Sequence, residues 1–188
     1  MEEKNKAWKT VSSKYLFRRP WLTVRCEDML LPNGNHIPEY YILEYPDWVN
    51  TIAITKEGKF VFVRQYRPGI QRTCYELCAG VCEAEDASPL VSAQRELWEE
   101  TGYGKGNWQE YMVVSANPST HTNLTHCFLA TDVELIDHQH LEDTEDLSVH
   151  LLTLEEVRSL LENNEIMQSL NAAPLWKYMA SLQSKIII

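Results

Sequence analysis

Three glutamates stand close together in the stretch QRELWEETG (94–102): Glu96, Glu99 and Glu100. On a helix, residues three and four positions apart share one side, so these carboxylates repel by about 0.2–0.5 kcal/mol per pair. Negative charge is also unfavourable at the C-terminal end of a helix. A solvated acidic face is the alternative interpretation. The two penalties together favour a divalent cation between the carboxylates, and oxygen ligands favour Mg²⁺ or Mn²⁺.

A helix must position these glutamates, and the flanking residues predict one over 89–101. Ser88 can cap its N-terminus, Pro89 suits the first helical position, and Gly102 suits the C-terminal end. Apolar residues on another face can pack on a sheet: Leu90, Ala93 and Leu97. Arg95 lies four residues before Glu99 and can brace that carboxylate.

The rest of the chain is predicted to form strands and two more helices. Strands are expected over 21–31, 37–45, 49–55, 59–66, 74–78, 108–115, 124–133 and 147–153. The first two form a hairpin, and Pro46 ends that region because proline cannot donate to a strand ladder. Thr153 can cap the second helix, and the third is expected to begin near Pro174. These elements predict an α+β chain in which residues 1–46 form a separate small antiparallel sheet.

Composition limits the possible functions. Of the 188 residues, 44% are apolar, which suits a packed core, and the net charge of −10 disfavours a broad nucleic-acid surface. Anionic substrates are compatible with this charge because bound metal ions reverse the local sign. No stretch has the length and hydropathy of a membrane span or a signal peptide. We therefore expect a cytoplasmic protein without nucleic-acid or membrane partners.

The five cysteines, an odd number, indicate free thiols in a reducing compartment. Cys74, Cys78 and Cys82 recur every four residues, so a metal site is the alternative interpretation. Structural zinc sites usually repeat a nearby pair of cysteines elsewhere in the chain, and this sequence has no second pair. The favoured interpretation is that these are small, buried apolar side chains.

The stretch GVCEAEDASPLVSAQRELWEETGY (80–103) resembles the Nudix box, G-x5-E-x7-R-E-U-x-E-E-x-G-U, where U is a bulky, mostly apolar residue. The second half matches at every defined position. In the first half Asp86 stands where glutamate is expected, and Arg95 comes one residue late, which indicates a one-residue insertion before the helix. The carboxylate that braces the arginine in this family is therefore expected from Asp86 or Glu85.

Further stretches are similar to the ADP-ribose pyrophosphatases of that family. VRQYRPG (63–69) and YELCAG (75–80) resemble the approach to the box, with Cys78 where proline is usual. EDTEDLSV (142–149) resembles the acidic loop that enters a late strand in these enzymes. The resemblance covers most of the chain.

Trp21 and the leading strands resemble the N-terminal domain that these enzymes exchange across a homodimer. The resemblance therefore implies a Nudix α/β/α sandwich with a mixed sheet over 47–188. It is preceded by the small antiparallel sheet over 1–46, which would serve dimerisation and base binding. The implied state is a homodimer.

The resemblance also implies a set of metal ligands. Glu96 and Glu100 would bind Mg²⁺ (or Mn²⁺) most directly, with Glu99 assisting as a further ligand. Glu99 and Arg95 would also be catalytic residues. The main-chain carbonyl of Ala79 would be another ligand, and Gly80 would let the backbone approach the ions.

Four residues outside the helix are candidates for other roles. Glu145 is expected to be the general base, with Glu142 as the second candidate; a solvated loop is the alternative for both. Arg67 could hold a phosphate, or could pair with Glu76 instead. Trp21 could stack on the nucleobase, or could lie in a core or a dimer interface.

The expected activity is Mg²⁺-dependent hydrolysis of the diphosphate bond of ADP-ribose or a related nucleoside diphosphate sugar. The products would be a nucleoside monophosphate and a sugar phosphate. One alternative keeps the chemistry but acts on another nucleotide, such as a damaged nucleoside triphosphate. The other alternative is a Nudix-fold sensor that binds such a ligand without cleaving it.

Overall fold

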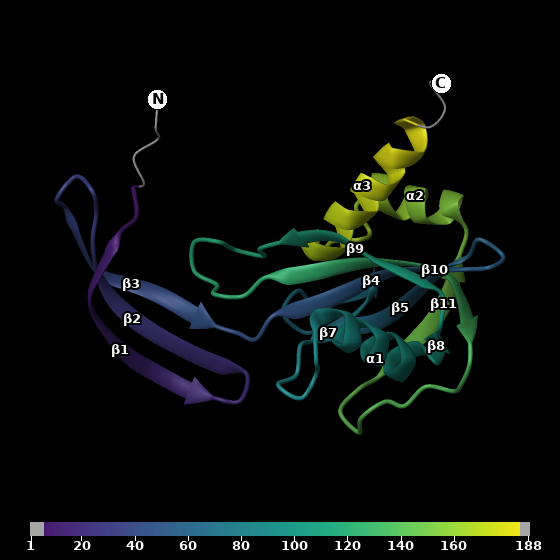
Figure 1. Cartoon of the computed structure of the whole chain (residues 1–188), viewed down its shortest axis with the longest axis horizontal. Coiled ribbons are helices and arrows are strands. Elements are labelled where there is room, and N and C mark those ends of the chain that lie inside the picture. The colour runs from purple at the N-terminus through teal and green to yellow at the C-terminus, as the bar shows by residue number, and fades with distance from the viewer. Residues whose placement is uncertain (1–5, 185–188) are drawn as a thin grey trace. The chain divides into compact units, whose positions relative to one another are not determined.

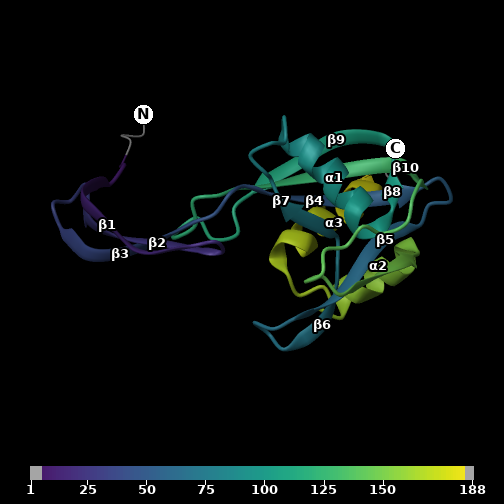
Figure 2. The same cartoon turned by 90° about the horizontal axis from the view of Figure 1, so that it is seen from below.

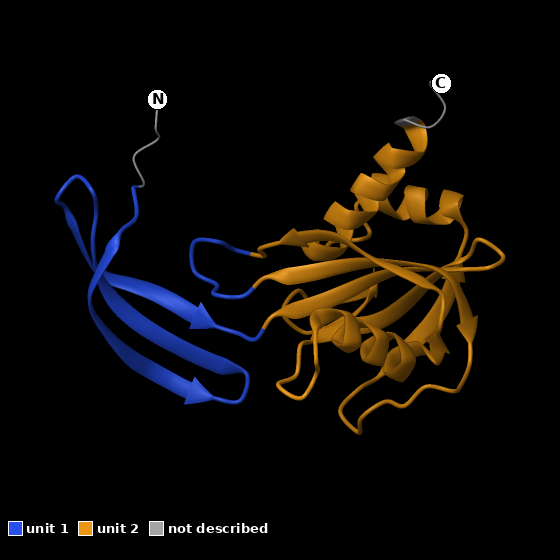
Figure 3. Ribbon diagram, in the orientation of Figure 1, with its two compact units in different colours: residues 1–46, 117–123 blue, residues 47–116, 124–188 orange. Residues whose placement is uncertain are grey.

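The computed structural model of the chain describes residues 6–184. The chain forms two compact units (Figure 3). Unit 1 comprises Met1–Pro46 and Asn117–Asn123, and unit 2 comprises Asp47–Ala116 and Leu124–Ile188. The segment Asn117–Asn123 thus belongs to unit 1, although both of its neighbours in sequence belong to unit 2.

Unit 1 contains a three-stranded antiparallel sheet in the order β1-β2-β3. Its strands are β1 (Lys9–Arg19), β2 (Leu22–Leu30) and β3 (His36–Glu44). The expected hairpin is confirmed: Gly34 takes a φ of 88° in the turn, and the amide of Leu31 donates to the carbonyl of Asn35. Leu43 also forms an isolated bridge with His121, which joins the segment Asn117–Asn123 to this sheet.

Unit 2 is built on an eight-stranded mixed sheet (Figure 1). Its strands are β4 (Trp48–Thr55), β5 (Phe60–Arg67), β6 (Arg72–Glu76), β7 (Cys78–Val81), β8 (Tyr103–Gly104), β9 (Asn107–Val114), β10 (Thr125–Leu135) and β11 (Leu147–Leu152). The main path is β11-β5-β4-β10-β8, with β6 beside β5, β7 beside β4 and β9 beside β10. The pair β4–β10 is parallel, and the other pairs of strands described are antiparallel.

Helices cover both faces of this sheet (Figures 1 and 2). On one face lies α1 (Pro89–Thr101), and on the other lie α2 (Leu154–Glu162) and α3 (Ser169–Ser184). Alternate strand residues supply the two cores because successive side chains point to opposite faces. Ile52 packs with the core that includes α2 and α3, whereas its neighbour Ala53 packs with Leu97 of α1. The α/β/α sandwich expected from the sequence is confirmed.

Two of the expected elements were wrong in their bounds. The strand expected over 74–78 is interrupted at Leu77, because β6 pairs with β5 whereas β7 pairs with β4. The third helix begins at Ser169, not near Pro174, and that proline lies inside it. Proline has no N–H for the carbonyl four residues earlier, which is that of Leu170. The side-chain amide of Asn50 donates to this carbonyl instead, at 2.7 Å.

Among the helices within residues 6–184, none combines the length and the hydropathy needed to cross a membrane.

Candidate active site

Helix α1 presents the glutamates as the sequence predicted. Ser88 caps it by accepting a hydrogen bond from the amide of Val91, and Pro89 occupies the first turn. Gly102 ends it in the left-handed conformation, with a φ of 74°. Ala93 and Leu97 are fully buried against the sheet, which fixes the rotation of the helix and directs the glutamates toward β7.

Arg95 connects the glutamates to the loop before the helix. Its Nη1 donates to Glu96 Oε1 at 3.0 Å and to Glu99 Oε2 at 2.9 Å. Its Nη2 donates to the Val81 carbonyl and to Asp86 Oδ2, both at 3.0 Å. The bracing carboxylate is therefore Asp86. Partial burial lowers the pKa of Arg95, but the Asp86 hydrogen bond and the glutamate charges outweigh this and raise it.

The one-residue insertion leaves this bracing interaction intact. The hydrogen bond from Arg95 holds the pKa of the Asp86 carboxyl below its ordinary value. The amide of Glu83 also donates to Asp86 Oδ2, at 3.3 Å, and this hydrogen bond fixes the position of the Asp86 carboxylate. Glu85, the other residue expected from the sequence, is exposed.

Glu96 lies against the backbone of β7. A Cβ built on Gly80 would lie 2.0 Å from Cδ of Glu96 and 2.1 Å from its Oε1. Only a glycine at this position lets the carboxylate approach the strand so closely. Burial is the largest cause that raises the pKa of Glu96, and the negative charge of Glu99 adds to it.

Glu100 is the most buried of the three glutamates, with 5% of the residue exposed. Its Oε2 accepts a hydrogen bond from the amide of Ala79 at 3.1 Å. Burial raises the pKa of the Glu100 carboxyl to about 8, although hydrogen bonds from Cys78 and Ala79 lower it in part. The charges of Glu96 and Glu145 raise it further.

These carboxylates fit a divalent cation with hard oxygen ligands. Burial disfavours the charged form of Glu96 and of Glu100, so nearby positive charge would stabilise the ionised form of each. Glu96 already shares Arg95. The hydrogen bonds described for the Glu100 carboxylate within residues 6–184 come from neutral donors, Cys78 and Ala79. A cation between Glu96 and Glu100, beside Ala79, would supply the missing charge.

Arg67, at the end of β5, is bound to Glu76. Its Nε donates to Oε1 at 2.8 Å and its Nη2 to Oε2 at 2.5 Å. Glu76 is buried, and its hydrogen bond is the main cause of the raised pKa of Arg67. The ion pair considered as one alternative from the sequence is therefore present. The arginine nevertheless also lines a cavity that reaches Ala79 and Gly80.

That cavity has a volume of about 270 Å³ and lies against the backbone of β7. Its polar lining includes three residues that sequence reasoning missed: Asn50, Thr125 and Asn171. Each is buried, and Asn50 Oδ1, Thr125 Oγ1 and Asn171 Oδ1 have no hydrogen-bond partner within residues 6–184. Asn50 is a polar residue within the otherwise mainly apolar stretch VNTIAIT. This interruption is the sequence feature from which a functional role of Asn50 could have been suspected. Buried polar atoms without partners are costly unless a ligand or water satisfies them.

The acidic loop between β10 and β11 holds Glu142 and Glu145 in a turn. The amide of Glu142 donates to Oε2 of Glu145 at 2.9 Å, and the amide of Glu145 donates to the Glu142 carbonyl at 3.0 Å. Both glutamates are exposed. The charge of Glu145 is one of the smaller causes of the raised pKa of Glu100.

Trp21 lies in unit 1, in the turn between β1 and β2. It is 80% exposed, so the alternative that placed it in a core is wrong. It lines a cavity of about 340 Å³ in unit 1 together with Arg19, Thr23 and Tyr45. An exposed indole beside a cavity is free to stack on a planar ligand or to enter an interface.

The cysteines are all unpaired. Cys26, Cys74, Cys78 and Cys127 are buried, and Cys82 is half-buried. Burial raises the pKa of the Cys78 thiol well above its ordinary value, so it is a neutral donor beside Glu100. This agrees with the interpretation of these residues as small core side chains.

Comparison with family models gives two matches. Residues 8–43 match the nucleoside diphosphate sugar hydrolase N-terminal domain, and residues 45–172 match the NUDIX domain. The second match spans more than half of the chain.

Curated relatives cover most of the chain. An ADP-ribose pyrophosphatase of Bacillus subtilis (strain 168) is 31% identical over 84% of this chain and 85% of its own length. A methanol dehydrogenase activator of Bacillus methanolicus is 30% identical, with 86% of both chains covered. A solved structure described as an ADP compounds hydrolase superposes with a TM-score of 0.82 at 20% identity, covering 95% of both chains. That last similarity shows the fold.

Proposed function

This chain belongs to the Nudix hydrolase family, and on that premise we propose that it hydrolyses the diphosphate bond of ADP-ribose or a related nucleoside diphosphate sugar. The products would be a nucleoside monophosphate and a sugar phosphate. The observation that carries the proposal is the group formed by Glu96, Glu99 and Glu100 with the backbone at Ala79 and Gly80. Two relatives named as ADP-ribose pyrophosphatases, from Bacillus subtilis and Mycobacterium tuberculosis, support the choice of substrate.

Glu96 and Glu100, with Glu99 and the Ala79 carbonyl, would hold Mg²⁺ (or Mn²⁺). An ion held by these residues would supply positive charge against the diphosphate and Lewis acidity toward its oxygens and a water molecule. Arg95 holds the carboxylates in place, since it donates to Glu96 and Glu99 at once. Its own position is fixed by Asp86.

The attacking water needs a base that accepts its proton. We assign this role to Glu145, because its charge acts on Glu100 and because it lies on a loop that can approach bound substrate. The hydrogen bond that its carboxylate accepts from the Glu142 amide would have to be released or shared in that step. Glu142 is the second candidate.

Arg67 would bind a phosphate of the substrate, and its position in the lining of the cavity beside Ala79 and Gly80 supports this role. Its side chain keeps 43% of its surface exposed while it is bound to Glu76, which leaves part of it accessible to a ligand. The carboxylate of Glu76 then acts to orient the arginine.

The cavity beside β7 would receive the sugar of the substrate. The side-chain amides of Asn50 and Asn171 each use Nδ2 as a donor, to the Leu170 carbonyl and to Gln168 Oε1, both at 2.7 Å. Their oxygens are thereby left as acceptors. Sugar hydroxyls are donors, so they complement these acceptors.

Unit 1 would bind the nucleobase and a second copy of the chain. Trp21 offers an exposed indole for stacking on the base. Apolar side chains on β1 and β2 expose 41–54% of their surface: Val11, Tyr15, Leu16, Phe17 and Leu22. An exposed apolar set of this kind is typical of an interface. We infer a homodimer, and five unpaired cysteines favour the cytoplasm.

The proposal is tested by incubating the protein with Mg²⁺ and a panel of nucleoside diphosphate sugars, dinucleotides and oxidised nucleoside triphosphates, with products identified by mass spectrometry. Heavy-oxygen water identifies the phosphorus that is attacked. Fastest turnover of ADP-ribose or a related sugar nucleotide is expected. Fastest turnover of a triphosphate would contradict the substrate class. Tight binding without turnover of any compound would favour the sensor instead.

A further inference from the structure

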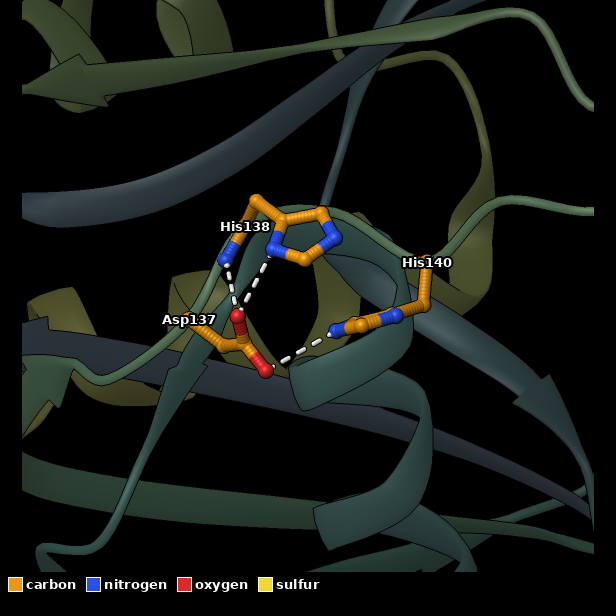
Figure 4. A group of neighbouring side chains, drawn as sticks. All are labelled: Asp137, His138 and His140. Carbon is orange, nitrogen blue, oxygen red and sulfur yellow. Dashed lines mark hydrogen bonds and ion pairs between the residues drawn. The ribbon is translucent and has the colours of Figure 1, made fainter.

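A second group of metal-ligand side chains lies outside the glutamate helix, in the loop that leaves β10: Asp137, His138 and His140 (Figure 4). Their ligand atoms all lie within 4.8 Å of one another. Asp137 Oδ1 is 2.7 Å from Nδ1 of His138, and Oδ2 is 3.0 Å from Nε2 of His140. The two imidazoles therefore present a nitrogen each to the same carboxylate.

The loop that carries these ligands is docked on the end of α1. Four hydrogen bonds join the two: Ile136 N to Gly102 O at 2.9 Å, Asp137 N to Gly102 O at 3.1 Å, His140 N to Glu99 O at 2.8 Å, and Gln139 Nε2 to Glu100 O at 2.7 Å. A Cβ on Gly102 would lie 2.1 Å from the Asp137 carbonyl oxygen, so glycine is needed for this approach. The ligands are thus held on a fixed backbone.

The ring of His140 is also fixed. It stacks on Trp98 of α1 with the ring centroids 4.1 Å apart and an angle of 27° between the planes. The rings of His138 and His140 lie 4.3 Å apart. Because the orientation of the His140 ring is set before any ion arrives, this ligand loses little side-chain entropy on binding.

Two imidazole nitrogens and one carboxylate oxygen suit zinc and similar transition metals, with an open position for water. The oxygen-only glutamate cluster suits Mg²⁺ instead. The end of α1, where the loop is docked, also favours a cation because the helix dipole is negative there. The competing explanation is that the imidazoles are hydrogen-bonded to Asp137 as ordinary exposed ion pairs, which contribute little.

We propose that Asp137, His138 and His140 bind one divalent transition-metal ion of the zinc class, at a site separate from the Mg²⁺ cluster. Binding would hold the start of the loop between β10 and β11 against α1. Because the same loop carries Glu145, the ion would limit the motion of the proposed base. Zinc binding at this site does not depend on the hydrolytic activity being as proposed.

The site is tested by calorimetric titration of zinc into the full chain with excess Mg²⁺ present. The variants His138→Ala and His140→Ala are each expected to bind one zinc ion fewer per chain, or to bind it at least roughly tenfold more weakly. Substitution of residues that only support the ligands already lowers metal affinity by about 10–100-fold, so loss of a ligand should do at least as much. His36→Ala is the matched control, because His36 is exposed and lies 3.0 Å from a single carboxylate, that of Asp28. Equal zinc binding in the wild type and the loop variants would overturn the proposal. So would an equal loss in the control.

A second measurement locates the ion. Paramagnetic Co²⁺ at His140 should quench the fluorescence of Trp98, whose ring it would approach closely. The quenching is expected to be present in the wild type and to be reduced in Trp98→Phe and in His140→Ala. Equal quenching in all three proteins would place the ion elsewhere and contradict the proposed site. In the presence of a chelator, the three proteins should have the same thermal unfolding temperature, which would show that the substitutions leave the fold intact.

Discussion

Gly80 and Glu96 share one small space: a Cβ on Gly80 would lie 2.0 Å from the carboxylate carbon of Glu96. Gly80 lies inside strand β7 and not in a turn, so its contribution is space. It leaves room for a carboxylate that comes from a different element, α1, to lie against β7.

Gly80→Ala should displace Glu96 while leaving the fold intact, because the side chain that must move is flexible. We expect kcat/KM to fall by about 100-fold, as misplacement of a group by about 1 Å can cause. Gly69→Ala is the control, since a Cβ there has no neighbour within 4 Å. Steady-state kinetics with saturating Mg²⁺ make the comparison. Equal effects of the two substitutions would contradict the steric explanation.

Removal of metal should make stability depend on pH through Glu100. Its pKa is raised in the folded state to about 8, so the neutral carboxyl is the form that the fold favours. Stability from this group is full below its ordinary pKa and is lost as the pH rises through about 8. Thermal unfolding in a chelator should show this loss. The variant Glu100→Gln carries a side chain that is neutral at every pH, so its stability should fall less as the pH rises. The same substitution should lower kcat by orders of magnitude. A pH dependence equal to that of the wild type would exclude Glu100 as its source.

Asp86→Asn should loosen Arg95 without removing it, because the Val81 carbonyl and two glutamates still bind the guanidinium. We expect kcat/KM to fall about tenfold, which corresponds to about 1.4 kcal/mol. Glu85→Gln is the control, and it should behave as the wild type because Glu85 is exposed. The opposite ranking of the two variants would assign the bracing role to Glu85.

Glu145→Gln should lower kcat by roughly 10²–10⁴-fold if the residue is the general base. Glu142→Gln provides the comparison, because Glu142 contributes only its backbone to the two hydrogen bonds of the turn. Its effect should be smaller. Measurement of kcat as a function of pH for both variants separates loss of the base from disorder of the loop. A larger decrease in kcat for Glu142→Gln than for Glu145→Gln would identify Glu142 as the general base instead.

Trp21→Ala should raise KM more than it lowers kcat, since stacking acts on binding. Removal of one base–aromatic stack weakens binding by roughly 1–3 kcal/mol, which corresponds to an increase in KM of about 5- to 150-fold. Trp8→Ala is the control, because Trp8 belongs to the same unit but packs edge-on against Tyr40. A fall in kcat alone, with the oligomeric state unchanged, would argue against stacking by Trp21.

The helix and its glutamates could be predicted because their signals are local. Ser88, Pro89 and Gly102 stand next to the ends that they form, and the predicted bounds 89–101 agree with α1. Spacing along the helix then places Glu96, Glu99 and Glu100 on one side. The choice between Asp86 and Glu85 was left open by the sequence, because it depends on which side chain the loop directs toward Arg95.

The errors arise where a distant element decides. Leu77 interrupts the expected strand because the chain leaves β5 for β4 at that point. Pro174 looks like the start of a helix, but Asn50 binds the carbonyl that the proline leaves without a partner. The role of Asn50 could be suspected from its apolar neighbours, but its partner lies 120 positions away.

The parallel pairing of β4 with β10 also has a consequence for how the protein is made. Trp48 lies opposite Thr125, and Asn50 reaches as far as Leu170. Contacts between such distant segments form late because a long loop must close first. A nascent chain emerging from the ribosome would therefore expose β4, with its apolar residues on both faces, until β10 has been synthesised. Chaperone dependence during translation should be concentrated in that interval.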